Sequence, residues 1–311
     1  MNAHATDEAT ASHVTGRRFV IRNGGAEAEI ASLAAALRGY RRQGVELAEP
    51  FGPDELPPMG SGILLAPWGN RIEDGRWTLD GAVQQLDITE PSRGHASHGL
   101  LRNTGYHALA QEPGQLLLGA EIFPQHGFPF RMTHTVRYRL DDDGHLHVEQ
   151  DLVNHSRAVA PAALGAHPYL RIGDVPTERL RLTVPATRYL QADERLIPRA
   201  VAPLDGEHDF TRGRALDGIL LDCAFTGLEA DADGLVRHRL EAPDGRAAAL
   251  WTDDAFPYVH IFVTNQYRGR PLAVAIEPMT APANAFNSGD GLRWLAPGGR
   301  LTARWGIESW L

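Results

Sequence analysis

The stretch from Arg131 to Val153 alternates with a period of two residues, and this pattern constrains the fold more than any other feature. One face of its first half is formed by Met132, His134, Val136, Tyr138 and Leu140, and the other by Arg131, Thr133, Thr135, Arg137 and Arg139. Residues 141–144 supply a turn, and His145 to Val153 return as a second strand. Because strand side chains point alternately to opposite faces, the pattern predicts an antiparallel hairpin with one buried face.

The rest of the chain is also typical of an all-β protein. Its 32 glycines and 21 prolines are spread along the sequence, and frequent turn signals favour many short strands. Tyr258 to Thr264 and Leu301 to Ile307 are strand-like. The alternation of strands and helices found with parallel sheets is missing, as are glycine-rich phosphate loops. With 311 residues, the chain could form one large all-β domain or two smaller domains.

One segment, Ala26 to Leu37, is ambiguous between helix and strand. It is rich in Ala, Glu and Leu, which are good helix formers. Glycines at 24, 25, 39 and 44 flank it and equally suit a pair of short strands. Propensity alone predicts a helix, and tertiary context often overrides it.

Charge and composition exclude several classes of function. The net charge of −9 argues against a nucleic-acid partner, which usually requires a basic stripe. The single cysteine, Cys223, cannot form an intrachain disulfide, so the chain is compatible with a reducing compartment. No apolar run approaches the roughly 18 residues of a membrane span. Residues 1–16 lack the features of a secretory signal. We expect them to be a disordered lead-in, and we expect a cytoplasmic protein without a membrane partner.

Two predicted strands lined with small residues end in ionisable groups. His167 shares a strand face with Ala163 and Gly165, and Glu277 shares one with Ala273 and Ala275. Faces without bulk leave room for a ligand, and an imidazole and a carboxylate that open onto it could transfer protons. Each residue also has a plain alternative, a satisfied core histidine and a glutamate in an ion pair.

Further polar groups lie among apolar neighbours. In Pro67-Trp68-Gly69-Asn70-Arg71-Ile72, the arginine could donate several hydrogen bonds in a fixed fork, or it could be a surface residue near a turn. Asp222 lies inside the apolar run Leu220 to Phe225. Since an unpaired buried carboxylate is costly, it should have a partner, either a backbone amide or a bound hydroxyl.

His95 and His98 are three residues apart, a spacing that also occurs in metal sites. No cysteine cluster accompanies them, and no other histidine motif has metal-ligand spacing. A loop histidine aimed at a polar ligand and a purely structural histidine remain the alternatives. We expect neither a metal nor a cofactor.

Together these motifs resemble the aldose 1-epimerase (galactose mutarotase) family, from about Arg18 to the C-terminus. The resemblance depends on the order and spacing of five stretches: Gly69-Asn70-Arg71-Ile72, Ser97-His98-Gly99-Leu100, Gly165-Ala166-His167-Pro168-Tyr169, Leu221-Asp222-Cys223-Ala224-Phe225, and Ile276-Glu277-Pro278 with Asn284-Ala285-Phe286-Asn287. It implies a large antiparallel β-sandwich, formed here as a single domain by residues 17–311, and it favours strands for Ala26 to Leu37.

The resemblance also implies an activity and a role for each polar position. The family interconverts the α and β anomers of an aldose and uses no cofactor. By resemblance, Glu277 is the base, His167 is the acid and His98 assists at the ring oxygen. Arg71 and Asp222 hold sugar hydroxyls. We add Asn70 as a neighbouring substrate-binding group, and Trp68, Tyr169 and Phe286 as aromatic platforms for a sugar ring, with core packing as their alternative.

The sequence departs from the family pattern at two positions, and it leaves rival functions open. Cys223 stands where the family often has His or Asn, and Leu100 where it often has Gly. These differences put the particular sugar in doubt. One rival is a hexose-6-phosphate 1-epimerase, in which Arg93 and Arg102 would bind phosphate. Another is a sugar-binding β-sandwich without activity. We expect a small-molecule sugar as the ligand and a monomer or homodimer as the assembly.

Overall fold

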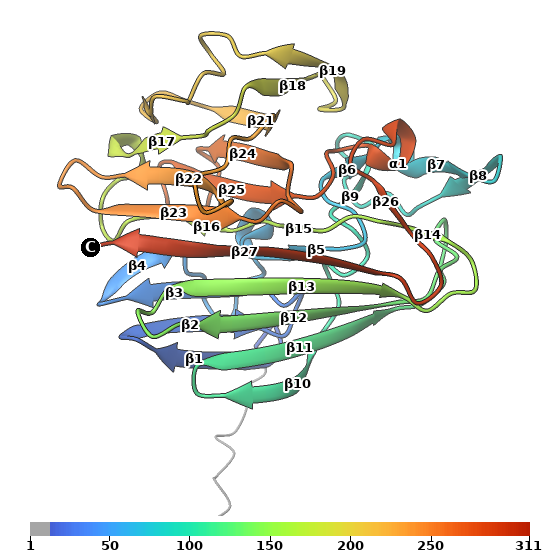
Figure 1. The fold of residues 1–311 in the computed structure, drawn as a ribbon, viewed down its shortest axis with the longest axis horizontal. Coiled ribbons are helices and arrows are strands. Elements are labelled where there is room, and N and C mark those ends of the chain that lie inside the picture. The colour runs from blue at the N-terminus through green and yellow to red at the C-terminus, as the bar shows by residue number, and fades with distance from the viewer. Residues whose placement is uncertain (1–12) are drawn as a thin grey trace, which may run out of the picture.

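Two large antiparallel sheets form the architecture of the computed structural model, which describes residues 13–311 (Figure 1). The larger sheet has twelve strands. Ten of them follow one path: β1 (Arg18–Asn23), β2 (Ala26–Ala31), β3 (Leu37–Arg42), β4 (Val45–Ala48), β16 (Tyr169–Leu170), β25 (Ala273–Met279), β24 (Tyr258–Thr264), β21 (Leu221–Thr226), β18 (Arg188–Ala192) and β19 (Pro198–Pro203). Beside this path, β15 (Gly165–Ala166) pairs with β25 and with β5 (Leu64–Leu65).

The smaller sheet has nine strands, and those between residues 107 and 154 run side by side across the lower half of Figure 1. Its order is β10 (His107–Glu112), β11 (Gln115–Ile122), β12 (Met132–Leu140), β13 (Leu146–Asn154), β27 (Arg300–Trp310), β23 (Ala247–Thr252), β22 (Val236–Glu241), β17 (Arg181–Thr183) and β20 (Arg214–Ala215). Three two-stranded pairs complete the sheets: β6 (Arg71–Ile72) with β9 (Ala96–Ser97), β7 (Arg76–Leu79) with β8 (Ala82–Gln85), and β14 (Ala160–Ala162) with β26 (Arg293–Leu295). The helical turns are η1 (Pro58–Gly60), η2 (Glu73–Gly75), η3 (Thr177–Arg179) and α1 (Ala285–Ser288).

The two large sheets share one hydrophobic core. Ile261 and Ile276 of the larger sheet belong to the same buried cluster as Val136, Val148 and Trp305 of the smaller sheet. Removing these apolar faces from water drives the sheets together. The predicted all-β fold, a large antiparallel β-sandwich, is confirmed.

The hairpin predicted between Arg131 and Val153 is present as β12 and β13. Buried and half-buried residues alternate along both strands without interruption. The register pairs Met132 with Asn154 and Leu140 with Leu146, so each inward side chain lies next to another inward one. The alternation in the sequence therefore reports the buried face of the smaller sheet.

The ambiguous segment Ala26 to Leu37 forms strands and not the helix that propensity predicts. Within β2, Ala28 and Ile30 are buried, while Glu29 between them points outward and pairs with Arg18 of β1. After β2 the chain turns sharply, and Ala34 and Ala35 have positive φ angles of 55° and 46°. Pairing with β1 and β3 outweighs the helix preference of these residues, as tertiary context commonly does.

The predicted lead-in, residues 1–16, lies outside the described residues except for its last four. Those four are attached to the fold: Thr15 is 1% exposed, and its carbonyl accepts a hydrogen bond from the Leu33 amide at 3.0 Å. Between residues 13 and 311, no helix has both the length and the apolar character needed to cross a bilayer.

Candidate active site

Antiparallel pairing with β25 brings His167 next to Glu277. Gly165 pairs with Met279 and Tyr169 pairs with Ala275, so His167, midway between them, lies level with Glu277. The His167 Nε2 and Glu277 Oε1 atoms are 3.2 Å apart, and the two side chains are only 5% and 2% exposed. The two strands singled out by their small residues are thus neighbours in one sheet.

The small residues themselves do not border open space, contrary to the prediction. Ala273 and Ala275 are fully buried under Tyr169 and Tyr267. At Gly165, an added Cβ would lie 3.2 Å from both a Leu65 methyl carbon and the Pro278 carbonyl oxygen. The lack of bulk therefore accommodates aromatic rings and a close strand approach, and the ligand space lies elsewhere.

A cavity of about 530 Å³ opens beside the His167–Glu277 pair. Six of the predicted site residues line it: Asn70, Arg71, His98, His167, Asp222 and Glu277. Residues that the sequence reasoning did not assign to the site also line it, above all Glu90 and His260. His260 carried a usable signal, because it lies on the predicted strand Tyr258–Thr264 and points away from its apolar Val259 and Ile261 neighbours. Glu90 carried none.

Trp68 and Tyr169 are not among the residues that line this cavity, which corrects their prediction as sugar platforms. Trp68 is 3% exposed and packs edge-on against Phe286, with ring centroids 5.5 Å apart. Tyr169 is 1% exposed and lies between two rings: it stacks on His167 at 5.3 Å and contacts Tyr267 at 4.7 Å. Trp68 and Phe286 are core residues, and Tyr169 supports the catalytic candidate from behind.

Two tightly linked loops present Arg71 and His98. Arg71 pairs with Ser97 across the β6–β9 ladder, and the His98 amide donates to the Asn70 carbonyl at 2.8 Å. Asn70 and His98 both have positive φ angles, 52° and 64°. At Gly99, with φ +75°, a Cβ would come within 2.1 Å of the Ala66 carbonyl oxygen, so only glycine fits this close approach.

Arg71 lies within a chain of alternating charges. Its Nε and Nη2 atoms donate to the two carboxylate oxygens of Glu90 at 2.8 and 3.2 Å. Its Nη1 atom donates to Asn70 Oδ1 at 3.2 Å, and its Nη2 atom lies 3.8 Å from Asp222 Oδ2. Arg93 reaches Glu90 from the other side at 3.4 Å. A bidentate arginine–carboxylate pair of this kind fixes the guanidinium plane.

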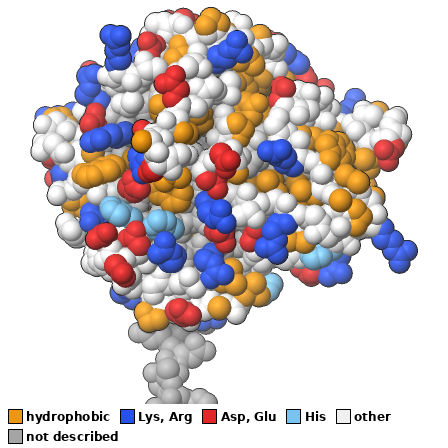
Figure 2. Space-filling view, in the orientation of Figure 1, with side chains coloured by type: hydrophobic (Ala, Val, Ile, Leu, Met, Phe, Trp, Pro, Cys, Tyr) orange, Lys and Arg blue, Asp and Glu red, His pale blue; other side chains and the backbone are white. Residues whose placement is uncertain are grey.

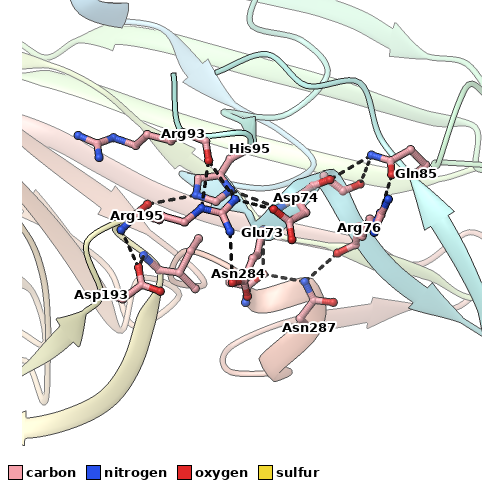
Figure 3. A network of polar contacts seen from close by, with 12 residues as sticks. Glu73, Asp74, Arg76, Gln85, Arg93, His95, Asp193, Arg195, Asn284 and Asn287 are labelled. Carbon is pink, nitrogen blue, oxygen red and sulfur yellow. Dashed lines mark hydrogen bonds and ion pairs between the residues drawn. The ribbon is translucent and has the colours of Figure 1, made fainter. Parts of the chain in front are cut away.

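The tip of the β18–β19 hairpin contacts the segments that contain Asp74 and Arg93 (Figure 3). Arg195 donates to the Arg93 carbonyl at 3.0 Å and also pairs with Asp74. His95 connects the segment of Asp74 with the hairpin tip. Its Nδ1 accepts a hydrogen bond from the Asp74 amide at 3.2 Å, and its Nε2 lies 3.1 Å from the Arg195 carbonyl. His95 therefore has a structural role. Within residues 13–311, no group of three or more His, Cys, Asp or Glu side chains is arranged to hold a metal ion.

The Asn284–Asn287 stretch is hydrogen-bonded to the backbone at and after Arg71. The Asn284 amide donates to the Arg71 carbonyl at 2.5 Å, and its side chain accepts from the Glu73 amide at 3.1 Å. Asn287 donates to the Arg76 carbonyl at 2.9 Å (Figure 3). The stretch overlaps the short helix α1 and is hydrogen-bonded to the segment after β6.

Burial dominates the electrostatics of the His167–Glu277 pair. Burial raises the pKa of Glu277 well above its usual range, and the negative charge of Asp222 adds to this rise. Burial lowers the pKa of His167 to about 3, with a smaller contribution in the same direction from His260. Both shifts favour the uncharged forms, a protonated Glu277 beside a neutral His167 imidazole.

Asp222 and His98 complete the electrostatics of the cavity. Burial disfavours a charged Asp222, but the hydrogen bond from His260 and the positive charge of Arg71 outweigh it and lower the pKa of Asp222 to about 2. Burial holds the pKa of His98 well below its usual value, and its ring lies edge-on to His167 at 5.4 Å. The cavity thus combines the Asp222 carboxylate, whose pKa is lowered, with the imidazoles of His98 and His167, whose neutral forms are favoured.

Comparisons with known proteins identify the family of the chain. The aldose 1-epimerase family model matches residues 17–308. YihR, an uncharacterized protein of Escherichia coli K12, is 29% identical over 93% of this chain and 92% of its own length.

Solved structures show the same fold. A galactose mutarotase-like protein from Clostridium acetobutylicum has a TM-score of 0.82 at 18% identity, covering 94% of both chains. A galactose 1-epimerase from Lactobacillus acidophilus NCFM has a TM-score of 0.76 at 18% identity, again covering 94% of both chains. The family match spans nearly the whole chain, and the chain belongs to the aldose 1-epimerase family.

Proposed function

We propose that the protein is an aldose 1-epimerase that interconverts the α and β anomers of a free aldohexose. The observation that carries the proposal is the 3.2 Å contact between His167 Nε2 and Glu277 Oε1 at the wall of a cavity that Arg71 and Asp222 also line. Anomerisation needs one group to take a proton and another to give one, and this pair supplies both.

In the proposed reaction, Glu277 takes the proton from the C1 hydroxyl and His167 gives one to the ring oxygen. The ring opens, the aldehyde rotates about C1–C2, and the ring recloses on the other face. In the uncharged forms Glu277 carries the proton to be transferred, and passing it from Oε1 to Nε2 across 3.2 Å gives the reactive ionised pair. Since the reaction neither gains nor loses protons overall, the pair returns to its starting state.

The charges of the cavity support a neutral sugar over a phosphorylated one. Both of its arginines already contact a carboxylate, because Glu90 bonds Arg71 in two places and lies 3.4 Å from Arg93. Asp222 and Glu277 add further acidic groups. Phosphate recognition usually relies on arginine or lysine donors that are free to form a fork on the anion. Ionised Asp222 instead suits a hydroxyl donor.

The surface is in keeping with a small-molecule substrate. On the face that Figure 2 shows, arginine side chains lie among acidic ones and do not form a continuous basic stripe. A nucleic-acid partner would require such a stripe.

Polarimetry tests the proposal. Anomerically pure aldoses, free and with an anionic group at C6, are followed to equilibrium with wild type, Glu277→Gln and a control, Glu149→Gln. Glu149 lies on β13 and pairs with Arg304, away from the cavity. We expect wild type and control to accelerate a free aldose, and Glu277→Gln to lose about 10²- to 10⁴-fold in rate.

Two outcomes would contradict the proposal. Tight binding of a free sugar without faster mutarotation would indicate a binding protein. Acceleration only of sugars with an anionic C6 group would replace the free aldohexose with a charged substrate.

A further inference from the structure

His260 occupies a central place in the site to which the proposed reaction assigns no role. It lies on β24, between β21, which carries Asp222, and β25, which carries Glu277. The register sets His260 opposite Glu277 on one side and opposite Ala224 on the other. Asp222 is two residues from Ala224, so its side chain is a diagonal neighbour of His260 on the same face of the sheet.

The contact between His260 and Asp222 is short and shielded. His260 Nε2 lies 2.7 Å from Asp222 Oδ1, and the imidazole is 9% exposed. Asp222 Oδ2 is 3.8 Å from the Arg71 guanidinium, beyond hydrogen-bonding distance, and has no hydrogen-bond donor within residues 13–311. His260 therefore occupies one carboxylate oxygen and leaves the other available to a ligand in the cavity.

We propose that His260 is a positioning residue that holds the Asp222 carboxylate in one orientation, so that Oδ2 accepts a sugar hydroxyl. This inference rests on the proposed function, in which Asp222 binds the sugar. His260 itself acts through Asp222, and the reacting pair stays His167 and Glu277.

The charges around Asp222 determine what loss of His260 should do. His260 faces it from β24, Arg71 from β6 and Arg93 from the segment before β9, while Glu277 lies on β25 beyond His260. Burial raises the pKa of Asp222, and the His260 hydrogen bond is the largest opposing influence. Without His260, the more distant arginines alone oppose burial, and Asp222 becomes protonated at a higher pH.

Two substitutions separate a positioning role from simple packing. His260→Phe fills the space but cannot donate to Asp222, whereas His260→Gln keeps an N–H donor. We expect His260→Phe to raise KM by about 10- to 100-fold, the loss typical of a hydrogen bond to a charged group. The increase should be largest at acid pH and should shrink as pH rises, with a smaller change in kcat. His260→Gln should recover most of the KM.

A second histidine provides the matched control. His238, on β22, is fully buried, and neither ring nitrogen has a hydrogen-bond partner within residues 13–311. His238→Phe should leave KM and its pH dependence unchanged. Circular dichroism and thermal unfolding of each variant identify any that fail to fold.

A double-mutant cycle with Asp222→Asn gives the decisive result. If His260 acts through Asp222, then His260→Phe should change KM little once Asp222 is already Asn, because the two substitutions remove the same interaction. Additive effects of the two substitutions on KM would overturn the inference. A uniform increase in KM at every pH, unrescued by His260→Gln, would also overturn it.

Calorimetric sugar binding separates failure of this inference from failure of the proposed reaction. If wild type does not accelerate anomerisation but His260→Phe weakens sugar affinity most at acid pH, then the positioning role stands without the reaction. If wild type is active but the KM of His260→Phe does not depend on pH, then the reaction stands and the positioning role is wrong.

Discussion

Replacing Glu277 by Gln should change the stability of the protein in a way that depends on pH. Glu277 is 1% exposed, and its Oε2 has no hydrogen-bond partner within the described part of the chain. Burial raises its pKa well above the usual range, so the folded protein keeps this carboxyl protonated where the unfolded chain has released the proton. Gln has a similar shape and cannot ionise.

The size of the effect follows from proton linkage. In the unfolded chain Glu277 titrates near pH 4.3, and its pKa in the folded state is higher. Between these two values, the free energy of unfolding of the wild type falls relative to that of Glu277→Gln by about 1.4 kcal/mol per pH unit. Two pH units into this window, the variant gains about 2.7 kcal/mol, whereas below pH ~4 the difference is constant.

Urea denaturation over a pH series, followed by circular dichroism, measures this difference. His167 is present in both proteins, so its own titration largely cancels. Glu29→Gln is the opposite control, because the hydrogen bond from Arg18 lowers the pKa of Glu29 and its ionised form stabilises the fold. That variant should lose stability relative to wild type as pH rises toward about 4.3, the usual pKa of Glu, and its deficit should stay constant above that pH. A difference for Glu277→Gln that stays flat from pH ~4 to ~8 would refute the reasoning.

Two further substitutions test the roles that the structure suggests for Trp68 and Arg195. Trp68→Ala should lower the free energy of unfolding by about 3–5 kcal/mol, because it leaves a cavity beside Phe286. Urea denaturation measures this change. Unchanged stability together with a raised KM would instead support Trp68 as a sugar platform. Arg195→Ala should raise KM by about 3- to 10-fold with little change in kcat, because it removes the contacts of Arg195 with the Arg93 carbonyl and with Asp74. Initial rates measure this change. An unchanged KM would show that the tip of the β18–β19 hairpin does not order the cavity rim.

Much of the fold could be predicted because burial of one strand face produces an alternation of apolar and polar residues in the sequence. The β12–β13 hairpin is the clearest case, since every second residue faces the core. In Ala26 to Leu37 the alternation is less informative, because alanine is compatible with either a helix or a buried strand face. Pairing with β1 and β3, which no local pattern encodes, determines the outcome there.

The site was predicted less completely, because proximity across strands depends on register. His167, Glu277, Arg71, His98 and Asp222 could be identified as unusual polar residues, and the structure brings them to one cavity. Whether a small or an aromatic residue faces ligand or protein could not be read locally. Tyr169 and Tyr267 cover the alanines of β25, and Trp68 packs against Phe286 in the core.

Glu277 lies on β25, and His167 lies in the short link between β15 and β16, which both pair with β25. Their spacing is maintained by the backbone ladder of one sheet, so assembling the reacting pair requires no domain closure. The rim of the cavity, in contrast, is built from connecting segments, including Ser92, Arg93, Asn265 and Gln266. Loops tolerate replacement far better than ladder positions do. An engineer could therefore exchange these segments to change which ligand the cavity admits and leave the His167–Glu277 pair in place.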